Sequence, residues 1–154
     1  MRIGTASNVA VVAVLAVLGA AWPNFAAEKR EKPMLTESGH TTDDLSVVRA
    51  RVANKEAVLL DVREKDEWDD GHLQAASLVP LSSLKDGMIP AEFVRLFPKD
   101  RPVYLHCRSG GRVLKCAELL QGRGYDIRPL KAGYQKLVES GFEKAVGSTS
   151  PRNP

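Results

Sequence analysis

Cys107 lies in the part of the chain whose residue types are best suited to nucleophilic chemistry. It is followed at once by Arg108-Ser109-Gly110-Gly111-Arg112, which supplies two guanidinium groups and two adjacent glycines. The thiolate is the nucleophilic form of cysteine, and neighbouring positive charge favours it. Glycines let the backbone curl, so that several N–H groups can face one anion. The pattern predicts a loop in which a thiolate attacks a small anionic substrate.

The residues on either side of this loop predict the elements that position it. Val103-Tyr104-Leu105 has the β-branched and apolar character of a buried strand, and residues 113–120 carry apolar side chains at helical spacing. Cys107 would then lie at the carboxyl end of a strand and just before a helix N-terminus. Open α/β sheets bind their ligands at this position. The unsatisfied N–H groups and the dipole of the helix add an anion cradle.

The rest of the chain alternates between strand and helix patterns. This alternation predicts an α/β fold with a parallel sheet covered by helices on both faces. The expected strands are 57–60, 77–79, 103–105 and 125–130. The expected helical segments are one that starts within 41–44, followed by 65–68, 90–97, 113–120 and 134–140. In the first of these helices, Leu45, Val48, Val52 and Ala53 form the expected buried stripe.

Composition and charge exclude several classes of function. The chain has 154 residues and a formal net charge of +3, with no basic patch interleaved with aromatic residues, so we expect no nucleic-acid partner. Three scattered histidines do not predict a metal site. Residues 99–136 hold nine basic and three acidic side chains. This local excess favours an anionic substrate or an acidic partner, although two ordinary solvated faces would also explain it.

The N-terminal residues differ from the remainder in composition. Residues 1–27 combine one early arginine, a short apolar run and small residues, which predicts a secretory signal peptide or an uncleaved membrane anchor. We therefore expect an exported protein, periplasmic or extracellular, that stays membrane-anchored if the segment is not cleaved. Residues 28–40 are interpreted as a linker, 41–146 as the folded domain and 147–154 as a flexible tail.

The second cysteine is expected to have a structural role. Cys116 shares one helical face with Val113, Ala117 and Leu120, which predicts a buried position. A residue inside a helix and one in the loop before it are too far apart for a disulfide. We therefore expect one reactive thiol and one buried thiol.

Two segments together resemble the rhodanese family. The first is Leu59-Leu60-Asp61-Val62-Arg63, continued by Glu67-Trp68, Gly71-His72-Leu73 and Ala75-Ala76; the second is the loop 107–112. The later segments 132–134 and 140–142 also fit, although many members have Gly-Gly and a tryptophan where this chain has Ala132-Gly133-Tyr134. The resemblance covers about residues 40–145. It implies a five-stranded parallel sheet flanked by helices and a sulfurtransferase activity.

The resemblance also implies roles for individual residues. Cys107 would take sulfane sulfur from a donor such as thiosulfate, and the resulting persulfide would pass it to a thiol, to cyanide or to a protein acceptor. The backbone of residues 108–112 would stabilise the thiolate and persulfide, with Arg108 steering the donor and Arg112 closing the loop. Asp61, Arg63 and His72 are possible supporting residues. We expect no cofactor beyond the persulfide itself, and a monomer.

Two other functions use similar residues. Cysteine phosphatases and arsenate reductases also hold a thiolate in an anion cradle, but those phosphatases place five residues between cysteine and arginine, and here four intervene. The shorter loop favours sulfur over a tetrahedral phosphate. A non-enzymatic module that carries sulfur for a partner protein would need the same cysteine and cradle, so the sequence leaves this alternative open.

Overall fold

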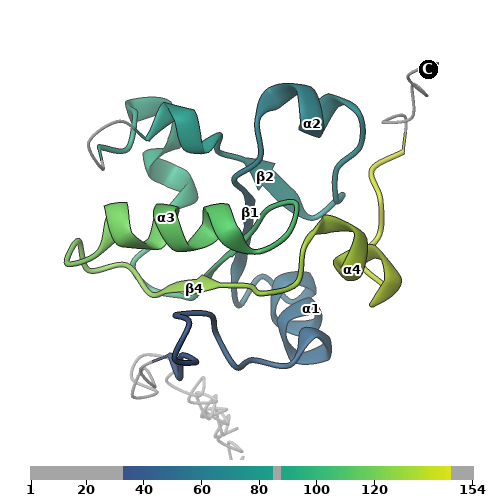
Figure 1. Ribbon diagram of the computed structural model, residues 1–154, viewed down its shortest axis with the longest axis horizontal. Helices are drawn as coiled ribbons and strands as arrows, with labels where there is room; N and C mark the ends of the chain where they lie inside the picture. The colour runs from purple at the N-terminus through teal and green to yellow at the C-terminus, as the bar shows by residue number, and fades with distance from the viewer. Residues whose placement is uncertain (1–32, 85–87, 147–154) are drawn as a thin grey trace, which may run out of the picture. The chain divides into compact units, whose positions relative to one another are not determined.

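The central feature of the fold is a parallel sheet. The computed structural model describes residues 33–84 and 88–146, and within them four strands pair in the order β2-β1-β3-β4, all parallel (Figure 1). The strands are β1 (Val58–Asp61), β2 (Ala76–Leu78), β3 (Val103–His106) and β4 (Ile127–Pro129). All four match the segments predicted from sequence. The α/β class with a parallel sheet is confirmed.

The expectation of five strands is wrong for the described residues. Beyond β4, at the edge where a further strand would add, the chain makes single contacts instead. The Thr41 N–H donates to the Pro129 carbonyl at 2.8 Å, and Leu35 and Thr41 form an isolated antiparallel bridge. A tight turn, with Gly39 at φ +82° and its N–H bonded to the Thr36 carbonyl, separates the two bridge partners and leaves no length for a ladder.

The side chains of β1 and β3 alternate between two hydrophobic clusters. Leu60, Leu105 and Cys107 face the cluster under α3 (Gly111–Leu120), whereas Leu59 and Tyr104 face the cluster formed with α1 (Leu45–Ala53) and α4 (Tyr134–Glu139). This period of two is the normal geometry of a strand buried on both faces. The sheet is therefore the middle of three layers.

Local sequence explains most helix ends, and three expectations need correction. Asp44 caps α1 by accepting from the Ser46 N–H at 2.7 Å, and Glu64 and Glu67 form a capping box at α2 (Lys65–Asp69). Ala53 is exposed and lies outside the buried stripe.

Helix α3 begins at Gly111, two residues earlier than predicted. The segment η3 (Ala91–Leu96), between Pro90 and Pro98, is a 3₁₀ helix, as the Phe93 N–H to Pro90 carbonyl bond shows.

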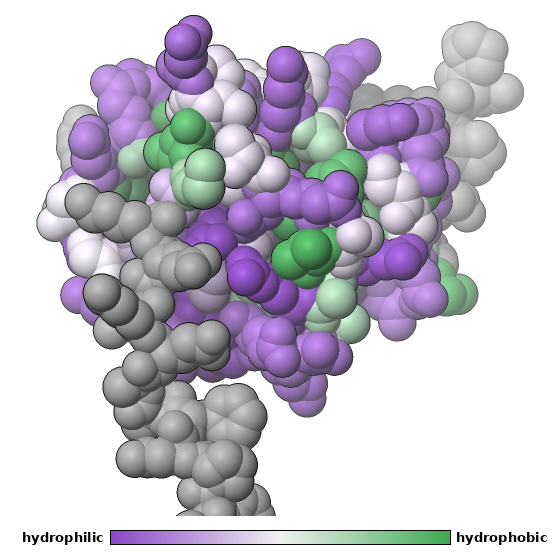
Figure 2. Space-filling model, turned by 90° about the horizontal axis from the view of Figure 1, so that it is seen from below, coloured by the Kyte–Doolittle hydropathy of each residue, from purple (hydrophilic) through white to green (hydrophobic). Residues whose placement is uncertain are grey.

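The surface viewed in Figure 2 is mostly hydrophilic, with hydrophobic residues in separate small groups. No helix of the described residues is both long and apolar enough to cross a membrane. The predicted signal segment, residues 1–27, and the predicted tail, residues 147–154, lie outside the described residues. Of the predicted linker, residues 33–40 are described, and His40 is buried.

Candidate active site

Cys107 follows β3 directly and lies at the carboxyl edge of the sheet, where the parallel strands end. Its side chain is 1% exposed, and its Sγ accepts a hydrogen bond from the Gly110 N–H at 3.2 Å. Gly110 is the N-cap residue of α3, so the sulfur sits at the start of that helix. The dipole of α3 and the unsatisfied N–H groups of its first turn favour negative charge there. The predicted arrangement of strand, cysteine, loop and helix is present.

The two glycines of the loop differ in how much room each position leaves for a side chain. Gly110 has φ +89°, and a Cβ on it would lie 2.6 Å from the Lys131 carbonyl oxygen, so only glycine fits. A Cβ on Gly111 would meet no atom within 4 Å. Gly110 therefore fixes the shape of the loop, whereas the space beside Gly111 is open.

Arg112 does not stand free beside the thiol, because it pairs with Glu67 of α2. Its Nη2 donates to Glu67 Oε1 at 2.8 Å, and Nη1 donates to Oε2. The hydrogen bond from Arg112 lowers the pKa of Glu67, and the same bond raises the pKa of Arg112. This two-bonded pair ties the first turn of α3 to α2. Such two-bonded pairs of arginine and carboxylate have a fixed geometry, and the loop-closing role that the resemblance implies for Arg112 stays a prediction.

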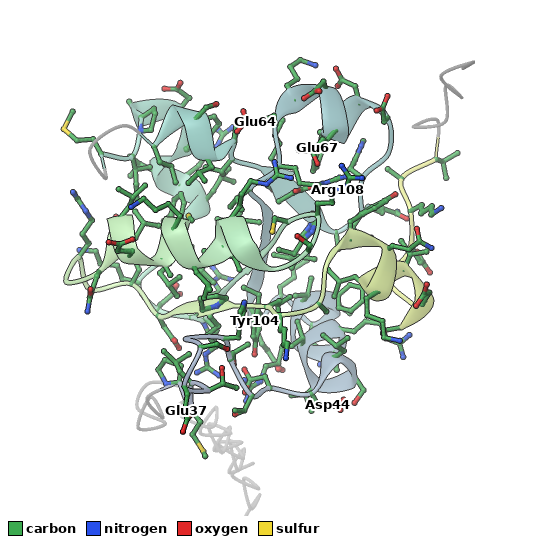
Figure 3. The ribbon with its side chains drawn as sticks, viewed as in Figure 1. Glu37, Asp44, Glu64, Glu67, Tyr104 and Arg108 are labelled. Carbon is green, nitrogen blue, oxygen red and sulfur yellow. The ribbon has the colours of Figure 1, made fainter. Side chains whose placement is uncertain are left out.

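Arg108 and Ser109 form the exposed part of the loop. In Figure 3, Arg108 lies on the same side of the molecule as Glu67, between the loop and α2. An exposed guanidinium at this point is placed to meet an incoming anion. The steering role expected of Arg108 stays a prediction.

Asp61, the last residue of β1, and Arg63 form a buried ion pair. The buried Asp61 carboxylate accepts from Arg63 Nη2 at 2.7 Å and from its Nε, and Arg63 Nη2 also donates to the Gly71 carbonyl. The Arg63 guanidinium lies 4.3 Å from the ring centre of Tyr134. The Tyr134 N–H in turn donates to the Cys107 carbonyl at 2.8 Å. The Asp61–Arg63 pair is thus linked through Tyr134 to the backbone of Cys107, and the supporting role expected of both residues stays a prediction.

A second segment packs against the back of the loop. A Cβ on Gly133 would lie 1.9 Å from the Arg108 carbonyl oxygen, which leaves room for glycine alone. Sequence reasoning noted Ala132-Gly133-Tyr134 only as part of the resemblance. The structure shows that Gly133 permits the close backbone approach that holds the loop in place.

The histidines contribute to the surroundings of the loop in different ways. The His72 ring stacks on Trp68 at 3.8 Å and its Nδ1 is 3.1 Å from the Trp68 carbonyl oxygen, so it braces the end of α2. His106 is fully buried on the sheet face opposite Cys107, as predicted. Burial lowers its pKa to about 4, so it is neutral at neutral pH.

Sequence reasoning missed His40, which it placed in the linker. His40 Nε2 lies 2.9 Å from the Gly110 carbonyl oxygen in a buried contact. Seventy positions separate the two residues, so no local pattern could have connected them. Across the described part of the chain, no group of three or more His, Cys, Asp or Glu side chains could hold a metal ion.

Comparison with known proteins gives a consistent set of matches. A family model described as a rhodanese-like domain matches residues 44–140. The human thiosulfate:glutathione sulfurtransferase is 30% identical over 111 residues, which is 66% of this chain and 96% of that protein. The uncharacterised protein YqhL of Bacillus subtilis is 36% identical over 87 residues, 56% of this chain and 64% of that protein. The structure of a human single-domain sulfurtransferase matches with a TM-score of 0.54 and 31% identity, covering 64% of this chain and 95% of that one.

Proposed function

Because the chain belongs to the rhodanese-like domain family, we propose that it is a sulfurtransferase that carries sulfur as a persulfide on Cys107. The observation that supports this most directly is the Gly110 N–H bonded to Sγ at the start of α3. A donor at this point stabilises negative charge on the sulfur and on an atom attached to it.

The first half of the proposed reaction loads the cysteine. The Cys107 thiolate attacks the outer sulfur of thiosulfate, and a new S–S bond forms as the original S–S bond breaks. Sulfite leaves with the electron pair of the broken bond, and a persulfide anion remains on Cys107. Arg108, exposed at the rim, attracts the dianion, and the N–H groups at the start of α3 face the negative charge.

The second half returns the cysteine to its starting state. An acceptor such as cyanide or a thiolate attacks the outer sulfur of the persulfide, and the Cys107 thiolate leaves with the electron pair. With cyanide the product is thiocyanate, and with a thiolate it is a new persulfide. Neither half needs a bound metal or organic cofactor in this scheme, because the sulfur atom is transferred without net oxidation of the protein.

The size of the loop supports sulfur over phosphate as the transferred group. Four residues separate Cys107 from Arg112, and the Arg112 guanidinium is held by Glu67. A phosphoryl group presents three oxygens that all require donors, whereas the terminal sulfur of a persulfide is a single atom. We therefore propose negligible hydrolysis of aryl phosphates.

The deciding experiment combines turnover with mass spectrometry. The purified protein is incubated with thiosulfate, the mass at Cys107 is measured, and thiocyanate is quantified after cyanide is added. We expect one added sulfur atom at Cys107 and catalytic thiocyanate formation, both lost in Cys107→Ser. A persulfide without turnover would instead favour a sulfur carrier for a partner protein. Phosphatase activity without sulfur addition would overturn the proposal.

A further inference from the structure

His40 connects the segment before α1 to the back of the Cys107 loop. Its side chain is buried, and Nε2 lies 2.9 Å from the Gly110 carbonyl oxygen. A carbonyl oxygen only accepts hydrogen bonds, so Nε2 must carry the proton and donate. Nδ1 lies 3.0 Å from Ser38 Oγ, and in the neutral ring it accepts from that hydroxyl. The Gly110 carbonyl therefore selects the tautomer, and the Ser38 hydroxyl holds the ring from its Nδ1 side.

A hydrogen bond to the Gly110 carbonyl affects two backbone N–H groups of the loop. The N–H of Gly110 bonds to Cys107 Sγ, so a contact that fixes the orientation of Gly110 also fixes this bond. The same carbonyl shares its peptide unit with the N–H of Gly111, the first residue of α3. Hydrogen bonding to a carbonyl polarises the N–H of its peptide unit and makes that N–H a stronger donor. The first effect acts on the N–H that bonds to the sulfur, and the second acts on the first N–H of α3.

We propose that His40 is a positioning residue that holds the Gly110–Gly111 peptide and thereby raises the reactivity of Cys107. The role in catalysis rests on the sulfurtransferase function proposed above, because His40 touches the loop and not the substrate. The contact itself acts on the thiol whichever sulfur donor is used. The proposal can therefore be tested with a reagent that reports on the thiol alone.

The test compares four proteins with the wild type. His40→Leu removes the donor, and His40→Gln keeps an Nε2 donor at similar reach. Ser38→Ala removes the hydroxyl that holds the ring from its Nδ1 side. Tyr104→Phe is the matched control, because it deletes a 2.6 Å bond to Asp43 and lies away from Arg108 and the loop (Figure 3). Iodoacetamide alkylation at Cys107 is followed across a pH series by mass spectrometry, and thiocyanate formation gives kcat and KM.

We expect His40→Leu to move the pH profile of alkylation to higher pH and to lower kcat about tenfold with little change in KM, the scale of one lost hydrogen bond. Ser38→Ala should shift the profile less and in the same direction, and His40→Gln and Tyr104→Phe should match the wild type. An unchanged profile in His40→Leu would overturn the proposal, as would an equal shift in Tyr104→Phe. If His40→Leu fails to fold, an unchanged Ser38→Ala profile overturns it. Because alkylation needs no sulfur donor, this readout is independent of whether the sulfurtransferase function holds.

Discussion

At the scale of single residues, the two cysteines differ because of their surroundings. Cys107 has a backbone N–H directed at its sulfur at the start of a helix. Cys116 lies in the interior of α3, fully buried in the cluster between that helix and the sheet. Burial raises the pKa of the Cys116 thiol to about 12, which keeps it protonated. Since only the thiolate is nucleophilic, Cys116 is unsuited to catalysis.

This contrast gives a prediction for the buried thiol. Cys116→Ser should retain sulfur transfer while lowering the free energy of unfolding by about 1–3 kcal/mol, because a hydroxyl without a partner would replace a small apolar sulfur. Urea unfolding and the thiocyanate assay on the same preparation measure the two effects. A folded Cys116→Ser protein with no transfer would show that the roles of the two cysteines are wrongly assigned.

His106 is a buried titratable group outside the proposed chemistry. Among the described residues, neither of its ring nitrogens has a hydrogen-bond partner, and Nε2 lies 3.7 Å from the Asp61 carboxylate. Burial is the main cause that lowers its pKa from 6.5 to about 4, against the opposing effect of Asp61. Protonating it in the folded protein is therefore unfavourable at mildly acidic pH.

The pH dependence of stability follows from this shift. Between pH 6.5 and about 4 the unfolded chain binds the proton and the folded chain does not, so the free energy of unfolding falls as pH falls. The loss approaches about 3 kcal/mol at the acid end of this window. His106→Leu should remove this part of the acid sensitivity, as measured by urea unfolding at neutral pH and near pH 4. The same acid dependence in both proteins would contradict the assignment to His106.

At the scale of elements, close backbone packing against Gly133 holds the loop 107–112. Gly133→Ala should disrupt it, because the added Cβ would meet the Arg108 carbonyl, and we expect loss of sulfur transfer together with lower stability. Gly111→Ala is the matched control, since its Cβ would enter open space at the start of α3. Thermal unfolding and the transfer assay compare the two. Equal tolerance of both substitutions would show that the Gly133 contact does not hold the loop.

The elements themselves were largely predictable, and their contacts were not. The buried strands before Asp61 and before Cys107 were identified from their apolar runs, and the order strand, cysteine, glycines and helix located the loop. The partners of Arg112 and Gly110 could not be found in this way. Glu67 and His40 reach the loop only because the parallel sheet brings α2 and the segment before α1 beside it. The 3₁₀ geometry of η3 was not predicted either, because its apolar pattern does not distinguish a short 3₁₀ helix from a short α-helix.

At the scale of the whole molecule, residues 35–41 make contacts with the sheet and with the loop of Cys107. Sequence reasoning began the domain at residue 41 because residues 28–40 are polar. In the structure, Thr41 bonds to the carbonyl of Pro129 at the end of β4, and Leu35 pairs with Thr41 across a turn. His40, inside that turn, reaches the loop of Cys107. A segment without a hydrophobic pattern thus contacts both the edge of the sheet at β4 and the loop of Cys107.

Two truncations test where the folded unit begins. A chain starting at residue 33 keeps the turn, the bridge at Thr41 and the His40 contact, so it should unfold at the same urea concentration as the full chain and retain transfer. A chain starting at residue 41 loses the His40 contact and the Leu35–Thr41 bridge. Its free energy of unfolding should be lower by about 1–3 kcal/mol, because hydrogen bonds are removed and the Gly110 carbonyl is left unpaired. It should therefore unfold at a lower urea concentration, and it should transfer sulfur more slowly. If both truncated chains match the full chain in stability and in transfer, residues 33–40 are a linker, as their composition suggested.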